Sequence, residues 1–109
     1  MNETAITLAG NLVADPELRY TATGVPVANF RVASTARFKG PEGWQDGDTL
    51  FLTVNAWRDL AEHVAESAGK GTRVIVTGRI RQRTYEPKDG GQVTVTEVEA
   101  TDVGVSRSG

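Results

Sequence analysis

Large aromatic side chains alternate with polar residues in the segment 49–57. Strand side chains point in turn to opposite faces, so a strand here places Phe51, Thr53, Asn55 and Trp57 on one side. The other side is wholly apolar and is expected to face the core: Leu50, Leu52, Val54 and Ala56. Exposed aromatic rings among polar residues form a candidate binding surface.

A row of cations follows the same alternation in the segment 73–85, with Lys88 just beyond it. Four of its side chains fall on one face: Arg79, Arg81, Arg83 and Tyr85. Guanidinium groups attract phosphates, and aromatic rings stack on bases with about 1–3 kcal/mol for each base. A duplex hides the faces of its bases, so this combination favours an unpaired nucleic-acid strand as the ligand.

Each of these features also has a purely structural interpretation. Phe51 or Trp57 alone is compatible with core packing, and Trp57 could brace the start of a helix. Alternating arginines are typical of a solvated strand face, and Phe30 alternates with Val32 and is expected in the core. The coincidence of an aromatic strand, a basic row and the order of elements favours the binding interpretation.

The hydrophobic pattern predicts five strands and one short helix. Strands are expected over residues 6–12, 27–36, 49–57, 73–85 and 93–103. A helix is expected to begin near Asp59, with Glu62 in its first turn, and to stop at Gly69. Residues 39–47 are dense in strand-interrupting residues and are expected to form a loop.

The order β-β-β-α-β-β predicts an all-β fold, the OB-fold, which is a five-stranded Greek-key barrel whose sheet face binds oligonucleotides. A β-sandwich would normally need about seven strands. The length of 109 residues suits one domain.

The composition bounds the class of protein. The chain has no cysteine, which excludes disulfides and thiolate metal sites. It shows neither the roughly 20 apolar residues of a membrane helix nor a secretory signal, so we expect a cytoplasmic protein with no membrane partner. The net charge of −2 alone argues against a nucleic-acid partner, but a local basic face can exist on an acidic protein.

The sequence contains few groups that could act in catalysis. His63 is the only histidine, lies between Glu62 and Glu66, and is expected to be solvated on the helix. A histidine metal site would normally need further histidines or cysteines. Neither a Gly-Lys-Ser/Thr phosphate loop nor a Gly-x-Ser-x-Gly elbow is present. We therefore expect a protein that is not an enzyme and that holds no metal or cofactor.

Several short motifs form an ordered series along the chain. They are Gly10-Asn11-Leu12, Asp15-Pro16-Glu17-Leu18-Arg19-Tyr20 with Gly24, Val27-Ala28-Asn29-Phe30, Leu60-Ala61-Glu62, Lys70-Gly71 and Gly78-Arg79-Ile80-Arg81-Gln82-Arg83. With this series, residues 6–103 strongly resemble the bacterial and mitochondrial single-stranded DNA-binding proteins. The resemblance implies an OB-fold domain at residues 1–105 that assembles as a homotetramer. It also implies sequence-independent binding of single-stranded DNA near the nucleoid, in DNA replication, recombination and repair.

The resemblance also implies the residues of the site. The stacking aromatics of the family match Phe38, Phe51, Trp57 and Tyr85, and Phe38 rests on the resemblance alone. Arg81 and Arg83 match basic positions of the family. Together with the strand pattern, this predicts a DNA-binding set: Phe38, Phe51, Trp57, Tyr85, Arg79, Arg81, Arg83, Asn55 and Lys88.

The sequence departs from the family pattern in the third predicted strand. Leu50-Phe51-Leu52-Thr53 stands where the family often has Glu-Trp-His-Arg. Phe51 stacks less strongly than an indole, and Thr53 removes a cation. Leu52 replaces a histidine associated with subunit contacts, so the resemblance does not imply the geometry of the assembly. Tyr85 stands where a tryptophan is common.

The resemblance also concerns the C-terminus. Family members usually continue into a Gly/Pro-rich tail whose acidic-hydrophobic tip recruits partner enzymes. Residues 106–109 are expected to be the start of such a tail, truncated or absent in this chain. Replication and repair proteins are therefore expected as partners only if a full-length protein carries that tip.

Two other binding functions stay open on the sequence. One is another OB-fold nucleic-acid-binding protein, such as an RNA-binding or replication-restart factor, because discrimination against RNA depends on the surroundings of the 2′-hydroxyl. The other is a non-catalytic protein-interaction module, which would bury Phe51 and Trp57 in a dry interface.

Overall fold

The computed structural model describes residues 4–41 and 43–106, with side chains for residues 5–34, 41, 43 and 49–106. This part of the chain forms six strands and one helix. They are β1 (Thr4–Leu12), β2 (Glu17–Tyr20), β3 (Pro26–Gly40), β4 (Gly43–Trp57), α1 (Asp59–Ser67), β5 (Arg73–Tyr85) and β6 (Val93–Ser106). In these ranges no helix is long and apolar enough to cross a membrane.

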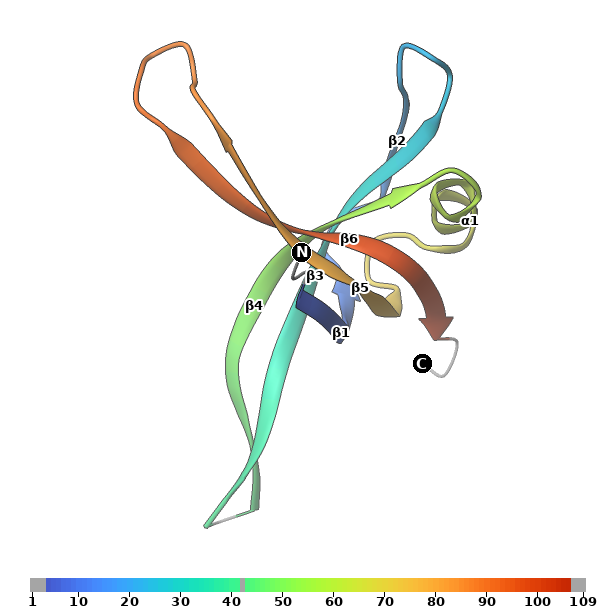
Figure 1. The fold of residues 1–109 in the computed structure, drawn as a ribbon. Coiled ribbons are helices and arrows are strands. Elements are labelled where there is room, and N and C mark those ends of the chain that lie inside the picture. The colour runs from blue at the N-terminus through green and yellow to red at the C-terminus, as the bar shows by residue number, and fades with distance from the viewer. Residues whose placement is uncertain (1–3, 42, 107–109) are drawn as a thin grey trace.

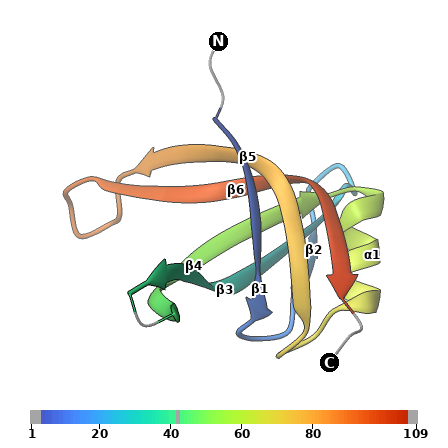
Figure 2. The same ribbon diagram turned by 90° about the horizontal axis from the view of Figure 1, so that it is seen from below.

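The strands form one sheet that closes on itself. Their order is β1-β5-β6-β4-β3-β2, and β1 also pairs with β3 at Asn11↔Ala33 and Leu12↔Val32. The pairing of β4 with β6 is parallel, and the other pairings are antiparallel. The ring β1-β5-β6-β4-β3 is the predicted OB-fold barrel, which β2 extends at one edge (Figures 1 and 2).

Alternating apolar side chains fill the barrel. Val74 and Val76 of β5 are fully buried between the exposed residues Arg73, Ile75 and Thr77. Helix α1 lies at one end of the barrel (Figure 2) and contributes buried Ala61 and Val64. The core residues are Leu8, Leu12, Ala28, Phe30, Val32, Val54, Ala56, Ala61, Val64, Ala68, Val74, Val76, Val98 and Val103. Full burial of one such aliphatic side chain stabilises the fold by about 1.5–3 kcal/mol.

Two glycines stand where strands approach too closely for a side chain. A Cβ atom at Gly10 would overlap the carbonyl oxygen of Ala33, where β1 passes from β5 to β3. A Cβ atom at Gly78 would overlap the carbonyl oxygen of Glu99, where the register between β5 and β6 shifts. Both glycines therefore mark bends that close the barrel.

The structure corrects the predicted elements in three places. The predicted loop over residues 39–47 is wrong, because the backbone continues as paired strands, with Lys39 opposite Trp44. The resulting β3–β4 arm projects from the barrel at the bottom of Figure 1. Strand β2 was not expected. Leu50, predicted in the core, is 58% exposed because it pairs with Ser34 on this arm, before β4 reaches β6 at Thr53.

The remaining elements follow the prediction closely. The bounds of β5 are confirmed, and Phe30 lies in the core with 4% exposure. The helix begins at Asp59, as expected, with Arg58 as its N-cap in the left-handed region at φ 61°. The tail was predicted to begin at residue 106, but Ser106 still belongs to β6 and pairs with Arg73; residues 107–109 lie outside the described residues.

Candidate nucleic-acid interface

The polar face of the sheet is built from residues that the strand pairing places side by side. Directly paired residues on neighbouring strands carry their side chains on the same face. Two rows cross β3, β4, β6 and β5 in that order: Asn29, Asn55, Glu99 and Arg79, and then Arg31, Thr53, Glu97 and Arg81. A shorter row crosses β2, β3 and β4: Arg19, Val27 and Trp57. The fold therefore brings the predicted residues of β4 and β5 onto one surface.

Three of the predicted stacking aromatics project from this face into solvent. Phe51 is 54% exposed, and Trp57 and Tyr85 are each 43% exposed. The guanidinium of Arg31 lies 5.1 Å from the ring centroid of Phe51. That of Arg83 lies 5.6 Å from the ring centroid of Tyr85. The interpretation of Phe51 and Trp57 as core packing is therefore wrong, and cations flank two of the rings.

Carboxylates of β6 interrupt the basic row. Arg83 donates two hydrogen bonds to Glu97, from Nε and Nη2, each of 3.3 Å. Nη1 of Arg81 lies 3.8 Å from Oε1 of Glu99. The hydrogen bond from Arg83 to Glu97, together with the charge of that carboxylate, raises the pKa of Arg83 above its ordinary value. The arginine side chains are exposed, 71% for Arg81 and 59% for Arg83, so these ion pairs contribute little to stability.

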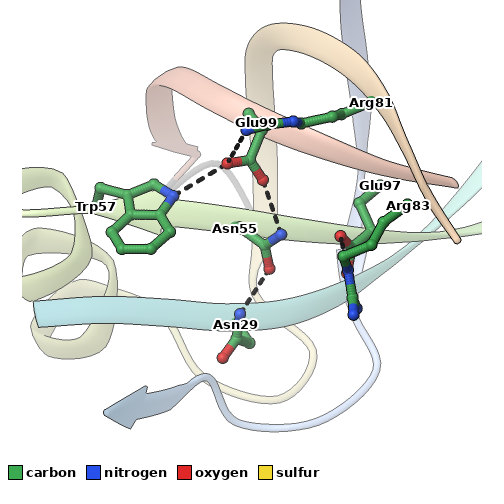
Figure 3. Close-up of polar contacts among 7 residues, drawn as sticks. All are labelled: Asn29, Asn55, Trp57, Arg81, Arg83, Glu97 and Glu99. Atoms are coloured by element: carbon green, nitrogen blue, oxygen red, sulfur yellow. Dashed lines mark hydrogen bonds and ion pairs between the residues drawn. The ribbon is translucent and has the colours of Figure 1, made fainter. Parts of the chain in front are cut away.

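A chain of hydrogen bonds lies beside Trp57 (Figure 3). The indole Nε1 of Trp57 donates to Oε1 of Glu99 over 3.1 Å, and Nδ2 of Asn55 donates to Oε2 of the same carboxylate over 2.8 Å. Nδ2 of Asn29 in turn donates to Oδ1 of Asn55 over 2.5 Å. The expected exposure of Asn55 is wrong: the residue is 8% exposed because these partners enclose it. Its contact with DNA stays a prediction.

A groove of about 440 Å³ lies over this network. Its lining combines an indole, two amides, two guanidiniums and a carboxylate: Arg19, Val27, Asn29, Thr53, Asn55, Trp57, Arg83 and Glu97. Binding pockets for small ligands span about 300–1,000 Å³. The groove therefore has the volume for a nucleotide, an aromatic wall for its base and cations for its phosphate.

Arg79 lies in the middle of the sheet, whereas Lys88 and Phe38 lie on its two projecting hairpins. Arg79 is exposed and pairs with Glu99 across β5 and β6. Lys88 is exposed in the turn of the β5–β6 hairpin, which extends away from the barrel in Figure 2. The side chain of Phe38 lies outside the described residues, although its backbone pairs with Gln45 in the β3–β4 arm.

Five residues of the face were not predicted from the sequence: Arg19, Asn29, Arg31, Glu97 and Glu99. The alternation of Glu97 and Glu99 in the predicted strand 93–103 was the available signal for the last two. Which strand they would face was not readable, because β4 and β6 are far apart in the chain. His63 is exposed on α1, as expected. Among the described side chains, those of residues 5–34, 41, 43 and 49–106, no cluster of three or more metal-binding groups is found.

Comparison with known proteins gives consistent matches over nearly the whole chain. The model of the single-strand binding protein family matches residues 3–106. A single-stranded DNA-binding protein of Corynebacterium glutamicum is 57% identical over 108 residues, which cover 97% of this chain and 48% of that protein. One of Mycolicibacterium smegmatis is 56% identical over 106 residues, covering 95% and 64%. The chain thus spans about half to two-thirds of the length of these curated relatives.

The fold has a match among solved structures as well. The crystal structure of a small single-stranded DNA-binding protein from Streptomyces coelicolor superposes with a TM-score of 0.82 at 38% sequence identity. The alignment covers 99% of this chain and 98% of the other.

Proposed function

This chain belongs to the single-strand binding protein family, and from that premise we propose that it binds single-stranded DNA without sequence preference. The observation that carries the proposal is the exposure of three aromatic rings on a strand face where such residues are commonly buried. Phe51 and Tyr85 each lie beside an arginine on the polar face, and Trp57 lines the groove together with Arg19 and Arg83.

In the proposed complex, the aromatic rings bind the bases and the arginines bind the phosphates. Unpaired bases stack on the exposed rings, and each stacked base contributes about 1–3 kcal/mol. Phosphates take the place of Glu97 and Glu99 beside Arg83 and Arg81. Arg79 and Lys88 extend the positive surface along the β5–β6 hairpin, and Phe38 adds a further stacking position. A base in a duplex offers no free face to these rings, so the surface selects single strands.

The wider role follows from the family. We propose that residues 1–105 are the DNA-binding domain of a cytoplasmic, nucleoid-associated protein that protects single strands in replication, recombination and repair. It acts as a homotetramer and as a binding protein without catalysis. Replication and repair proteins join the complex where a full-length protein carries an acidic C-terminal tip.

Titration with homopolymers tests the proposal. Poly-dT is expected to quench the fluorescence of Trp57 strongly in a variant with W44F, in which Trp57 is the only tryptophan. Matched poly-rU and duplex DNA serve as competitors, and mass in solution is measured in parallel. Tighter binding of poly-rU would assign the protein to RNA, and insensitivity to every nucleic acid would indicate a protein-interaction surface instead.

A further inference from the structure

The hydrogen-bond chain beside Trp57 has a direction that one residue imposes. A carboxylate only accepts hydrogen bonds, so Glu99 requires Asn55 to turn its NH₂ group toward it. The carbonyl of Asn55 then faces Asn29, which must donate. The indole N–H of Trp57 also donates a hydrogen bond to Glu99, over 3.1 Å. Glu99 therefore sets the orientation of two amides and one aromatic ring.

A carboxylate on this face needs an explanation, because it repels the phosphates of a bound strand. The side chain of Glu99 is 24% exposed and stands in the same row as Arg79, between β4 and β5. Its carboxylate accepts hydrogen bonds from Trp57 and Asn55 and forms an ion pair with Arg81 (Figure 3). Glu99 therefore acts through its contacts with other side chains of the protein rather than through a contact with DNA.

The role of Glu99 is to restrain the ring of Trp57, on which a base stacks in the proposed binding mode. Trp57 is 43% exposed, so packing alone restrains its ring less than it would restrain a buried one. Its Nε1 donates to Glu99, which fixes the rotation of the indole relative to the groove. A binding group held in its bound orientation loses less conformational entropy when the ligand arrives.

We propose that Glu99 is a positioning residue for DNA binding: it orients Trp57 through the indole N–H without contacting the strand. The inference rests on the proposed function, since it concerns the same site. It makes two opposite predictions for changes at one position. Removing only the charge of Glu99 relieves its repulsion of the phosphates and should favour DNA binding. Removing the hydrogen-bond acceptor as well releases the ring of Trp57 and should weaken DNA binding.

A double-mutant cycle separates these effects. E99L is expected to weaken binding of a labelled thymidine oligonucleotide by about three- to tenfold, which is part of the stacking contribution at Trp57. E99Q keeps an acceptor for the indole and is expected to recover binding relative to E99L. W57F lacks the N–H donor, so E99L is expected to add no further loss in the W57F background. E66Q, on exposed α1, controls for the change in net charge.

Ring motion gives a readout that does not depend on DNA. In the W44F background, time-resolved fluorescence anisotropy is expected to show faster motion of Trp57 in E99L than in E99Q. The proposal is overturned if E99L binds as tightly as E99Q, if its loss persists in W57F, or if the ring motion is unchanged. Failure of the parent protein to bind any single strand would instead refute the proposed function. The ring motion of Trp57 would still be measurable in that case, so the two failures can be told apart.

Loss of stability is a separate outcome that a second variant resolves. E99L leaves the buried Nδ2 of Asn55 without its acceptor, which costs stability. N55L/E99L replaces both partners by apolar side chains, so it removes the acceptor without stranding that donor. If E99L fails to fold, the anisotropy measurement on N55L/E99L decides the question, because the ring motion of Trp57 in the free protein does not depend on a contact between Asn55 and DNA: faster motion than in E99Q supports the proposal, and unchanged motion overturns it.

Discussion

Replacing Arg81 and Arg83 together by glutamine is the most direct test of the phosphate contacts. Each pairs with a carboxylate of β6 in the free protein, Arg83 with Glu97 at 3.3 Å and Arg81 with Glu99 at 3.8 Å. In the proposed binding mode, both arginines leave these carboxylates for phosphates of the strand, and the cations condensed on those phosphates are released. The double variant R81Q/R83Q is therefore expected to bind more weakly and with a flatter dependence on salt.

The size of the change follows from the number of contacts. For single strands, log K falls with log salt by about 0.7 for each neutralised phosphate, so two lost contacts reduce the slope by about 1.4. Between about 50 and 200 mM salt, the advantage of the parent protein should then shrink roughly sevenfold. Anisotropy titrations of a labelled thymidine oligonucleotide at several salt concentrations measure the slope.

R73Q is the matched control for this experiment. Arg73 lies on the same strand, but at its other end, where it pairs with Ser106 and reaches Asn11 at 3.5 Å. Its replacement is expected to leave the slope unchanged. An unaltered slope in R81Q/R83Q would refute the reasoning, because it would mean that neither guanidinium leaves its carboxylate for a phosphate.

Three further changes test other parts of the structure. W57A/Y85A should weaken single-strand binding by at least about tenfold, since two stacking positions are lost, while the circular dichroism spectrum and Tm stay close to those of the parent; unchanged affinity would remove the stacking assignment. E97Q should tighten binding about two- to fivefold at low salt, because Arg83 then no longer has to leave a charged partner; weaker binding would show that Glu97 supports the site. G78A should lower the free energy of unfolding by about 1–3 kcal/mol in urea titrations, because its Cβ meets the carbonyl of Glu99. G104A, whose Cβ would lie 4.0 Å from the nearest atom, is the control, and equal losses in the two variants would contradict the steric argument.

The sequence predicted those features that depend on local alternation. The bounds of β5, the core position of Phe30 and the exposure of Phe51 and Trp57 all follow from which residues share a strand face. The family resemblance added Phe38, whose side chain lies outside the described residues.

The errors arose where a residue's surroundings come from a distant part of the chain. Asn55 was expected in solvent because its strand neighbours are polar or aromatic, yet Glu99 of β6 encloses it. Leu50 was expected in the core because it continues an apolar row, yet that row runs past the barrel onto the arm. The glycines and proline of residues 39–47 indicated a loop, but a local two-stranded hairpin tolerates them.

The parallel pairing of β4 with β6 connects the proposed DNA-binding site to the closure of the barrel. It runs through Thr53↔Glu97, Val54↔Val98 and Asn55↔Glu99, so one short seam both links two walls of the barrel and supplies the carboxylates beside the arginines. We therefore expect substitutions at Glu97 or Glu99 to change both the affinity for DNA and the stability of the fold. Arg81 and Arg83, with side chains 71% and 59% exposed, offer positions at which binding can be tuned on its own.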